Sequence, residues 1–132
     1  EENEMSFLTD STEIQTDFQV ETIEYSKLSL KSILYNLISN TIKYQSPKRK
    51  LKSRVSTFEK EGRVVLEVAD NGLGIDMEKH GDKLFGMFKR FHHHHTGSGL
   101  GLYAVKEIVE RNDGQIQIES QVDKGTTFRI TL

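Results

Sequence analysis

The chain has 132 residues, the size of one ordinary domain and enough to bury a hydrophobic core. Its 18 basic and 20 acidic side chains give a formal net charge of -2, which favours neither nucleic acid nor an anionic membrane surface as a partner. The absence of cysteine excludes disulfides and thiolate metal sites, and no apolar run has the length of a membrane-spanning helix or a signal sequence. These features predict a cytosolic domain, alone or within a larger protein.

The N-terminal third predicts a lead-in, a strand and a long helix. Residues 1–12 are acidic and polar without periodicity, and the folded domain is expected over residues 13–132. Alternating apolar and polar residues predict a half-buried strand over 13–20. Helical spacing follows over 26–44, where Ser26 or Ser29 can cap the N-terminus. The apolar stripe of this helix consists of Leu30, Ile33, Leu34, Leu37 and Ile38.

Two amides and an ammonium group share one face of this predicted helix. At about 100° per residue, Asn36, Asn40 and Lys43 fall within roughly 60° of each other beside the apolar stripe. Asparagine is a poor residue inside a helix because its amide competes for backbone groups, so two in register favour a functional role. An ordinary solvated face is the alternative.

Two further strands, over 50–59 and 62–69, are predicted to form a hairpin at Glu61-Gly62. The second strand ends at Asp70, the first residue of the segment Asp70-Asn71-Gly72-Leu73-Gly74-Ile75. Its glycines permit a positive φ or a close approach to a flat ligand, which is typical of a binding loop, with a plain β-turn as the alternative. An EF-hand fits worse, because Gly72 and Gly74 would occupy ligand positions without a side-chain oxygen.

The segment from Gly74 to Gly97 has no sustained period and predicts a long mobile loop over a pocket. Helical spacing returns over 103–111 and is ended by Asn112-Asp113-Gly114, which should supply the left-handed residue that terminates a helix. Strands over 115–120 and 127–132 follow, joined by a turn that contains Gly125. The order predicts an α+β fold, a two-layer α/β sandwich with helices on one face of a mixed, mostly antiparallel sheet.

A glycine-rich segment, Gly97-Ser98-Gly99-Leu100-Gly101, opens the second long helix and is suited to an anion such as phosphate. A dinucleotide-binding fingerprint would need glycine at Leu102 and a strand before the segment, and a P-loop would need a Gly-Lys-Ser/Thr ending. The sequence therefore predicts a phosphate loop of another type.

The remaining polar groups extend this prediction to a nucleotide. Asn40 can offer an amide oxygen to Mg²⁺, Lys43 can pair with a phosphate, and Lys89 or Arg90 can reach a terminal phosphate. Asp70 can accept a hydrogen bond from the exocyclic amine of adenine, whereas guanine would place a carbonyl oxygen there. Leaving the carboxylate unsatisfied costs on the order of 1–3 kcal/mol, so adenine is favoured by roughly one to two orders of magnitude.

Five segments resemble, in order, the N, G1, F, G2 and G3 boxes of sensor histidine kinases, which belong to the gyrase and chaperone ATPase (GHKL) superfamily. They are residues 36–44, 70–75, 85–88 with Arg90, 97–102 and 125–128. The resemblance implies the Bergerat ATP-binding fold, a Mg²⁺-bridged triphosphate and a flexible ATP lid between the G1 and G2 boxes. It also implies a protein-histidine kinase, which phosphorylates a histidine from ATP and passes the phosphate to an aspartate of a response regulator.

The resemblance also assigns roles to residues. It implies catalytic roles for Asn36, Lys43 and Arg90, and a Mg²⁺ ligand in Asn40. The implied nucleotide contacts come from Asn36, Asn40, Lys43, Tyr44, Asp70, Gly72, Gly74, Ile75, Lys89, Arg90, Gly97, Ser98, Gly99, Leu100, Gly101, Leu102 and Thr127. The ATP hydrolases and serine kinases of the superfamily carry a glutamate base where Asn36 stands. An amide cannot take a proton at neutral pH, whereas imidazole is nucleophilic when neutral, so Asn36 favours the histidine kinase branch.

Two features depart from the family pattern. Asp123 stands where an extra glycine is often found, which should alter the turn with little effect on ATP. No phosphoacceptor histidine is visible, because His80 precedes a glycine and His92 to His95 lie in the predicted lid. We interpret this histidine run as part of the lid, with a tag remnant or a metal site as alternatives.

The missing phosphoacceptor sets the expectations for partners. A helical dimerisation and phosphoacceptor domain should lie upstream, with residues 1–12 as the end of its linker. A response-regulator receiver domain is the second expected partner, and no nucleic acid or direct membrane contact is expected. This fragment should be monomeric and unable to phosphorylate itself, and the full protein a homodimer, cytoplasmic or the cytoplasmic part of a membrane-bound sensor. The alternative is a non-catalytic adenine-nucleotide sensor or docking module.

Overall fold

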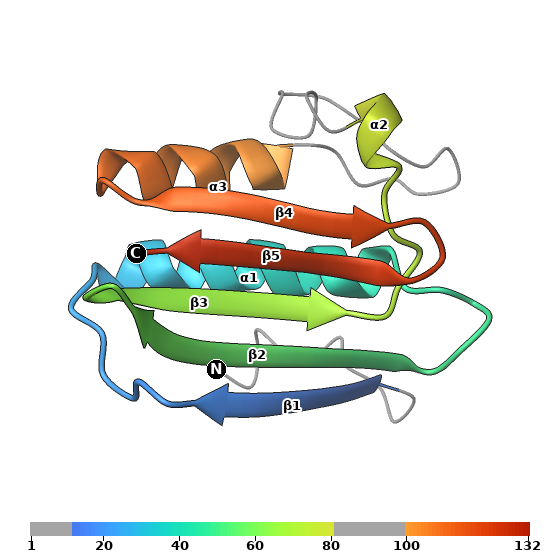
Figure 1. Ribbon diagram of the computed structural model, residues 1–132, viewed down its shortest axis with the longest axis horizontal. Coiled ribbons are helices and arrows are strands. Elements are labelled where there is room, and N and C mark those ends of the chain that lie inside the picture. The colour runs from blue at the N-terminus through green and yellow to red at the C-terminus, as the bar shows by residue number, and fades with distance from the viewer. Residues whose placement is uncertain (1–11, 81–99) are drawn as a thin grey trace.

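The computed structural model describes residues 12–80 and 100–132 as one sheet with helices against it (Figure 1). The elements are β1 (Thr12–Phe18), α1 (Lys27–Lys43), β2 (Leu51–Lys60), β3 (Arg63–Asp70), α2 (Met77–His80), α3 (Leu100–Arg111), β4 (Gln115–Gln121) and β5 (Gly125–Thr131). The five strands and two long helices predicted from the sequence are thus confirmed.

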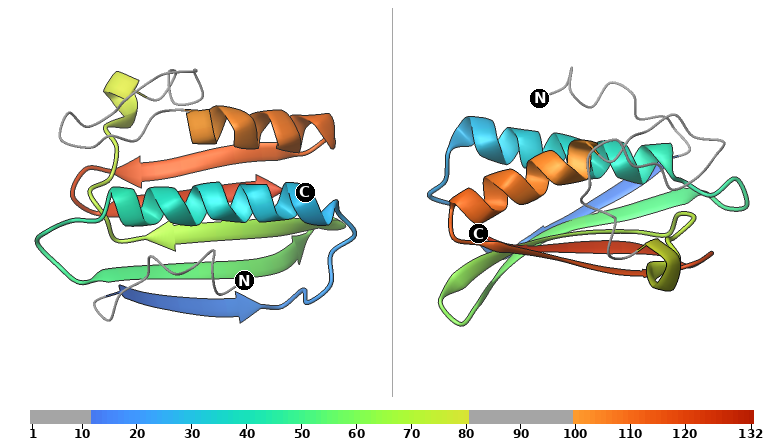
Figure 2. Two further views of the ribbon diagram at one scale, coloured as in Figure 1. Left: turned by 180° about the vertical axis from the view of Figure 1, so that it is seen from behind. Right: turned by 90° about the horizontal axis from the view of Figure 1, so that it is seen from above.

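The sheet has the strand order β1-β2-β3-β5-β4. β1 runs parallel to β2, and the other three pairs are antiparallel. Figure 2 shows α1 and α3 side by side on one face of the sheet. The predicted two-layer sandwich with a mixed, mostly antiparallel sheet is therefore confirmed.

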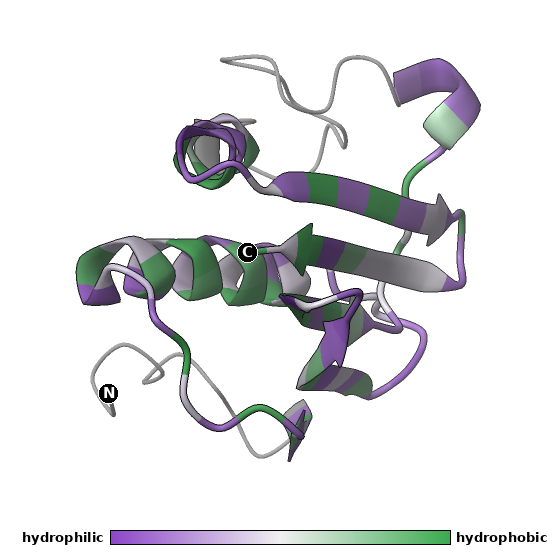
Figure 3. Cartoon of the chain, turned by 60° about the vertical axis from the view of Figure 1, so that its left-hand side comes forward, coloured by the Kyte–Doolittle hydropathy of each residue, from purple (hydrophilic) through white to green (hydrophobic). Residues whose placement is uncertain are grey.

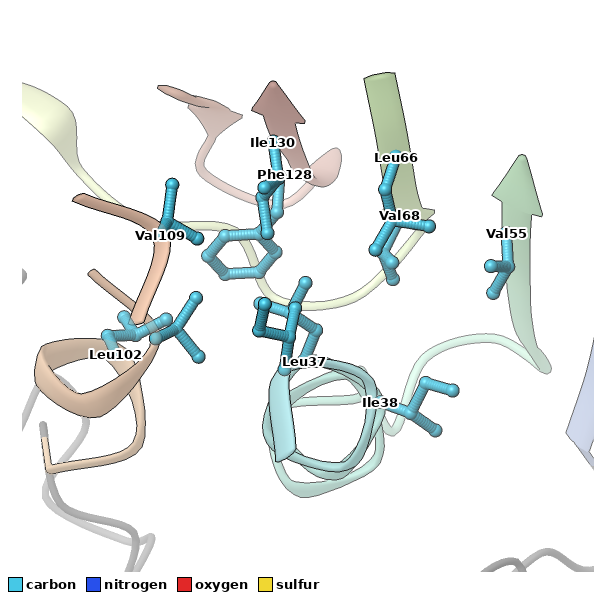
Figure 4. Packing of buried hydrophobic residues seen from close by; sticks show 11 residues of the cluster. Leu37, Ile38, Val55, Leu66, Val68, Leu102, Val109, Phe128 and Ile130 are labelled. Carbon is cyan, nitrogen blue, oxygen red and sulfur yellow. The ribbon is translucent and has the colours of Figure 1, made fainter. Parts of the chain in front are cut away.

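The core lies between α1, α3 and the helix-facing side of the sheet. Ile33, Leu37 and Ile38 are buried, as the apolar stripe of α1 predicts, and Figure 4 shows Leu37 directed at Val68 and Phe128 of the sheet. Full burial of each such side chain contributes about 1.5–3 kcal/mol. Figure 3 shows the alternation that makes this layer, with polar and apolar residues following one another along β4. The helix-facing side chains of each strand are thereby fixed by register.

Two turns have the left-handed residues that their geometry needs. Glu61 and Gly62 have φ of 54° and 80°, as in the two-residue hairpin predicted between β2 and β3. After α3 the left-handed residue is Asp113, with φ of 62°, and Gly114 does not have a positive φ. Gly114 is needed for space instead, since a Cβ there would meet the carbonyl oxygen of Thr131.

Two boundaries differ from the sequence prediction. A short helix, α2, lies in the segment predicted to be irregular, because Asp76 Oδ1 accepts hydrogen bonds from the amides of Glu78 (3.1 Å) and Lys79 (3.3 Å) and caps the turn. α3 begins at Leu100 rather than at Tyr103. The rest of the predicted lid, including His92 to His95, and the lead-in up to residue 11 lie outside the described residues. In the described part, no helix is both long and apolar enough to cross a membrane.

Candidate functional site around Asp70

Asp70 is the last residue of β3, where it pairs with Ser53 of β2 and Thr126 of β5. Strand alternation places it on the same face as Leu66 and Val68, towards the helices. Its carboxylate accepts hydrogen bonds from Gly72, from Thr41 and from the backbone of Thr126. The Gly72 amide donates to Oδ1 at 2.8 Å, and the Thr41 hydroxyl of α1 donates to Oδ2 at 3.2 Å.

Burial and hydrogen bonding act in opposite directions on this carboxyl. Burial raises the pKa of Asp70 above its ordinary value of 3.8, while the hydrogen bonds from Gly72, from Thr41 and from the backbone of Thr126 lower it again. Each carboxylate oxygen has about two acceptor positions, so the donors already present leave room for another. The site can therefore accept a hydrogen bond from a flat, amine-bearing ligand.

The loop after Asp70 is held at the C-terminal end of α1. The amide of Leu73 donates to the carbonyl of Tyr44 at 2.9 Å. A Cβ on Gly72 would lie 2.6 Å from that same oxygen, and Gly72 does not have a positive φ. Gly72 is therefore required by close packing against the chain itself. A positive φ at Gly72, one of the two roles that the sequence suggested, is thus wrong, and the close approach of a ligand there stays a prediction.

The other side of the loop contacts the turn between β4 and β5. Gly74 has the predicted positive φ, 76°, and a Cβ there would meet the carbonyl of Gln121. The amide of Asp123 donates to Leu73 O at 2.6 Å, and the amide of Ile75 donates to Ser120 Oγ at 2.8 Å. The loop is thus fixed between the end of α1 and the β4–β5 turn.

The predicted polar residues of α1 lie along its C-terminal half. Asn40 is half-buried and directly precedes Thr41, the residue that bonds to Asp70, and Lys43 is exposed in the last turn. Asn36 is half-buried one turn earlier, and its amide nitrogen donates to the carbonyl of Ser32 at 2.8 Å. Asn40 and Lys43 therefore share one end of α1 with Asp70. The hydrogen bonds that Asn36 makes with other described residues use its amide nitrogen.

Thr127 is not on the carboxylate's face of the sheet. In β5 the residues Thr126, Phe128 and Ile130 are buried towards the helices, and Thr127 alternates with them. Thr127 nevertheless lines an open hollow of about 330 Å³ together with Asp70 and Thr126. Thr127 therefore stays a predicted nucleotide contact, and Thr126 is the threonine that strand alternation places on the Asp70 face of the sheet.

The remaining predicted residues divide by where they lie. Ile75 packs against the core, and Leu102 is buried in the first turns of α3. Leu100 and Gly101 are the first two residues of α3. Lys89, Arg90, Gly97, Ser98 and Gly99 lie outside the described residues and stay predictions.

Two residues at the site were not predicted. Thr41 is 2% exposed and continues the apolar stripe of α1 three residues after Ile38, so a hydroxyl in that stripe was a readable signal. Arg49 lies between α1 and β2, and its guanidinium donates to the carbonyls of Asn71 (2.6 Å), Gly72 (2.8 Å) and Asp123 (2.9 Å). Sequence patterns gave no sign of Arg49, because its partners are 22 to 74 positions away.

Comparison with known proteins gives the same architecture. Residues 26–132 match the family model described as histidine kinase-, DNA gyrase B- and HSP90-like ATPase. A mycobacterial sensor histidine kinase, MprB, has a TM-score of 0.78 and 24% identity, with 92% of this chain and 81% of that chain covered. The full-length ShkA structure in complex with AMPPNP has a TM-score of 0.76 and 24% identity, with 91% of this chain and 25% of that chain covered.

Relatives at the sequence level include the sensor protein RprX of Bacteroides fragilis. It is 36% identical over 110 residues, which are 80% of this chain and 21% of RprX. The chain thus spans about a fifth of the length of that relative. The family match covers most of the chain, and the chain belongs to the histidine kinase-, DNA gyrase B- and HSP90-like ATPase family.

Proposed function

We propose that this chain is the ATP-binding and catalytic domain of a sensor histidine kinase, and that Asp70 recognises adenine. The observation that carries the proposal is the Asp70 carboxylate, which faces the helix layer and is oriented by Gly72 and Thr41. The similar ShkA structure is a complex with AMPPNP, an ATP analogue, and the relatives' names describe sensors and histidine kinases. Both support a nucleotide-dependent kinase role for this chain.

Base selectivity follows from the chemistry of Asp70. A carboxylate only accepts hydrogen bonds when ionised, so it pairs with the exocyclic amine of adenine. The carbonyl oxygen of guanine would face it without a hydrogen and leave it unsatisfied, at a cost of about 1–3 kcal/mol. Adenine nucleotides should therefore bind at least about tenfold more tightly than guanine nucleotides.

The end of α1 offers groups suited to Mg²⁺ and phosphates. Asn40 would supply an amide oxygen, a ligand type that Mg²⁺ accepts alongside water and phosphate oxygens. Asn36 and Lys43 would bind phosphate oxygens, and bound Mg²⁺ would neutralise phosphate charge. The N-terminal amides of α3, together with residues 97–99, would form the phosphate cradle, and Lys89 or Arg90 would approach the terminal phosphate.

The residues of the site fit transfer to histidine better than hydrolysis. A base that activates water or a hydroxyl must take a proton, and the amide of Asn36 cannot do so at neutral pH. Neutral imidazole needs no such base. The accepting histidine would come from a helical dimerisation domain of the full protein, and a receiver domain would take the phosphate from it. The catalytic domain would then work in the cytoplasm.

Phosphotransfer can be tested in trans. The chain is mixed with γ-labelled ATP, Mg²⁺ and a helical phosphoacceptor domain, preferably the one joined to it in the full protein. The proposal expects acid-labile label on the added histidine with the wild-type chain, and none with Asp70→Asn. ADP binding in the same preparation with no label on histidine would favour a non-catalytic nucleotide sensor or docking module instead.

A further inference from the structure

Arg49 joins three backbone segments at the site with one side chain. Its Nε donates to Asn71 O at 2.6 Å, and Nη2 donates to Gly72 O at 2.8 Å and to Asp123 O at 2.9 Å. Nε and Nη2 lie on one edge of the planar guanidinium, which matches two neighbouring carbonyls as a rigid fork. The side chain is 30% exposed, so most of its surface is covered by the chain that it binds.

The first of these bonds reaches the Asp70 carboxylate through a single peptide group. Asn71 O, which accepts from Arg49, and the Gly72 amide, which donates to Asp70 Oδ1 at 2.8 Å, belong to the same peptide unit. That unit is planar and trans, so the direction of its carbonyl fixes the direction of its N–H. A cation on the carbonyl also polarises the unit and strengthens the N–H as a donor. The orientation of Asp70 therefore depends on Arg49.

The neighbouring basic residue makes a useful contrast. Lys48 contacts the side chain of Asp123 at 3.4 Å, with 70% of its own side chain exposed. Within the described part of the chain, its ammonium group bonds to this carboxylate and not to the Asn71–Gly72 peptide, and exposed pairs of this kind contribute little. Arg49 and Lys48 thus carry the same charge on the same loop, but only Arg49 holds the peptide that orients Asp70.

We propose that Arg49 is a positioning residue for base recognition, which sets the Asp70 carboxylate for adenine by fixing the Asn71–Gly72 peptide and tying it to the β4–β5 turn. The inference rests on the proposed adenine site. Arg49 itself does not touch the base. Loss of Arg49 would let the Asn71–Gly72 peptide rotate and remove the ordered donor from Asp70 Oδ1. The carboxylate would then distinguish less well between the amine of adenine and the carbonyl of guanine.

The test measures ADP and GDP affinities by calorimetry, in Mg²⁺, for the wild type, Arg49→Ala and Lys48→Ala. Arg49→Ala is expected to weaken ADP binding about tenfold and to reduce the ratio of ADP to GDP affinity by a similar factor, since a charge-assisted hydrogen bond is lost. Lys48→Ala should change both affinities by less than about twofold. Thermal unfolding and circular dichroism establish that the variants are folded.

If the alanine variant does not fold, Arg49→Lys is used in the same measurement. Its single ammonium group cannot reproduce the fork, so the ADP to GDP ratio should still fall. A wild-type ratio in Arg49→Ala or Arg49→Lys, or an equal loss of ADP and GDP affinity, would overturn the positioning role. Wild-type protein that binds no ADP would instead refute the proposed function. Asp70→Asn separates failure of the proposed function from failure of the Arg49 inference, because it should lose the preference for adenine whether or not Arg49 positions Asp70.

Discussion

At Asp70 burial and hydrogen bonding act on a single carboxylate in opposite directions. Burial favours the neutral form and raises its pKa, while the donors from Gly72, Thr41 and Thr126 favour the charged form and lower it. The net direction is upward, so the folded chain does not fully compensate the buried charge. A carboxyl whose pKa is altered by burial is typical of functional sites, which agrees with the proposed role of Asp70.

The raised pKa of Asp70 predicts the direction in which the free energy of unfolding changes with pH. The folded chain keeps the Asp70 proton to a higher pH than the unfolded chain does, so this favourable contribution is complete below 3.8 and is lost as pH rises through the folded-state pKa. Asp70→Asn cannot titrate there and should change the free energy of unfolding at neutral pH by less than about 1 kcal/mol. As pH falls into that window, wild type should gain stability relative to Asp70→Asn.

Urea unfolding of both proteins, from neutral pH down towards 3.8, measures the difference between their free energies of unfolding. The other carboxylates are the same in both chains, so their titration cancels to first order. If acidification instead makes Asp70→Asn more stable relative to the wild type, the folded state lowers the pKa of Asp70.

We expect the hydroxyl of Thr41 to affect ADP affinity more than the volume of its side chain does. Thr41→Val keeps the volume but removes the donor to Asp70 Oδ2, leaving a buried acceptor unsatisfied, and should lower ADP affinity about tenfold. Thr41→Ser keeps the donor and loses only a methyl group, at a cost of about 1 kcal/mol in stability. ADP titration by calorimetry, with urea unfolding of each variant, compares the two. Equal affinities in both variants would contradict the assigned role.

At the scale of elements, the site depends on how the loop after β3 fits between α1 and the β4–β5 turn. The amide of Leu73 is bound by the end of α1, while Asp123 and Ser120 bind the same loop from the hairpin. Asp123 has φ of 67°. Its carbonyl accepts a hydrogen bond from Arg49 at 2.9 Å and its carboxylate lies 3.6 Å from the same guanidinium, so the side chain adds a partner that a glycine would lack.

Two glycines at opposite ends of β3 test this packing. Gly72→Ala would place a Cβ 2.6 Å from Tyr44 O and 3.0 Å from Asp70 Oδ1, so the loop must shift and ADP affinity should fall more than about tenfold. Gly62→Ala meets no atom within 4 Å, and its φ of 80° should cost about 1 kcal/mol in stability with no change in affinity. Calorimetric ADP affinity and urea unfolding measure both quantities. Unchanged ADP affinity in Gly72→Ala would refute the close packing as a requirement of the site.

Elements with a strong period could be predicted from the sequence, and contacts across the chain could not. The stripe of α1, the alternation of β4 and β5 and the turn at Glu61-Gly62 all follow local rules and are confirmed. α2 was missed because its four residues carry no period, and only Asp76 as a cap indicated it. Arg49 was missed because its role exists only once β3 and the β4–β5 turn are adjacent.

The same distinction explains the partial prediction of the site. Asp70 was recognisable because it ends an apolar strand before two glycines, and Asn40 and Lys43 because they share a helix face. Thr126 was not predicted beside Thr127, although the neighbouring Phe128 and Ile130 indicate that Thr126 faces the helices. The motif therefore located the segment, and the period of the strand was needed to identify Thr126 as a further residue beside Asp70.

For the whole molecule, the fold brings the site together from distant parts of one chain. α1 provides Thr41 and Asn40, β3 provides Asp70, and β5 provides Thr126, so the proposed nucleotide site depends on the register of the central strands. Both long helices lie on one face of the sheet (Figure 2), and Asp70 joins that layer through its hydrogen bond with Thr41 of α1. The described groups of the proposed nucleotide site thus all come from one folded unit.

The most direct test of this account is the affinity of the wild-type chain and of Asp70→Asn for ADP and GDP, measured by calorimetry in Mg²⁺. We expect the wild type to bind ADP at least about tenfold more tightly than GDP, and Asp70→Asn to lose both most of its ADP affinity and that preference. Equal affinity of the wild type for the two nucleotides, or an ADP preference that survives in Asp70→Asn, would contradict the assignment of Asp70 to adenine.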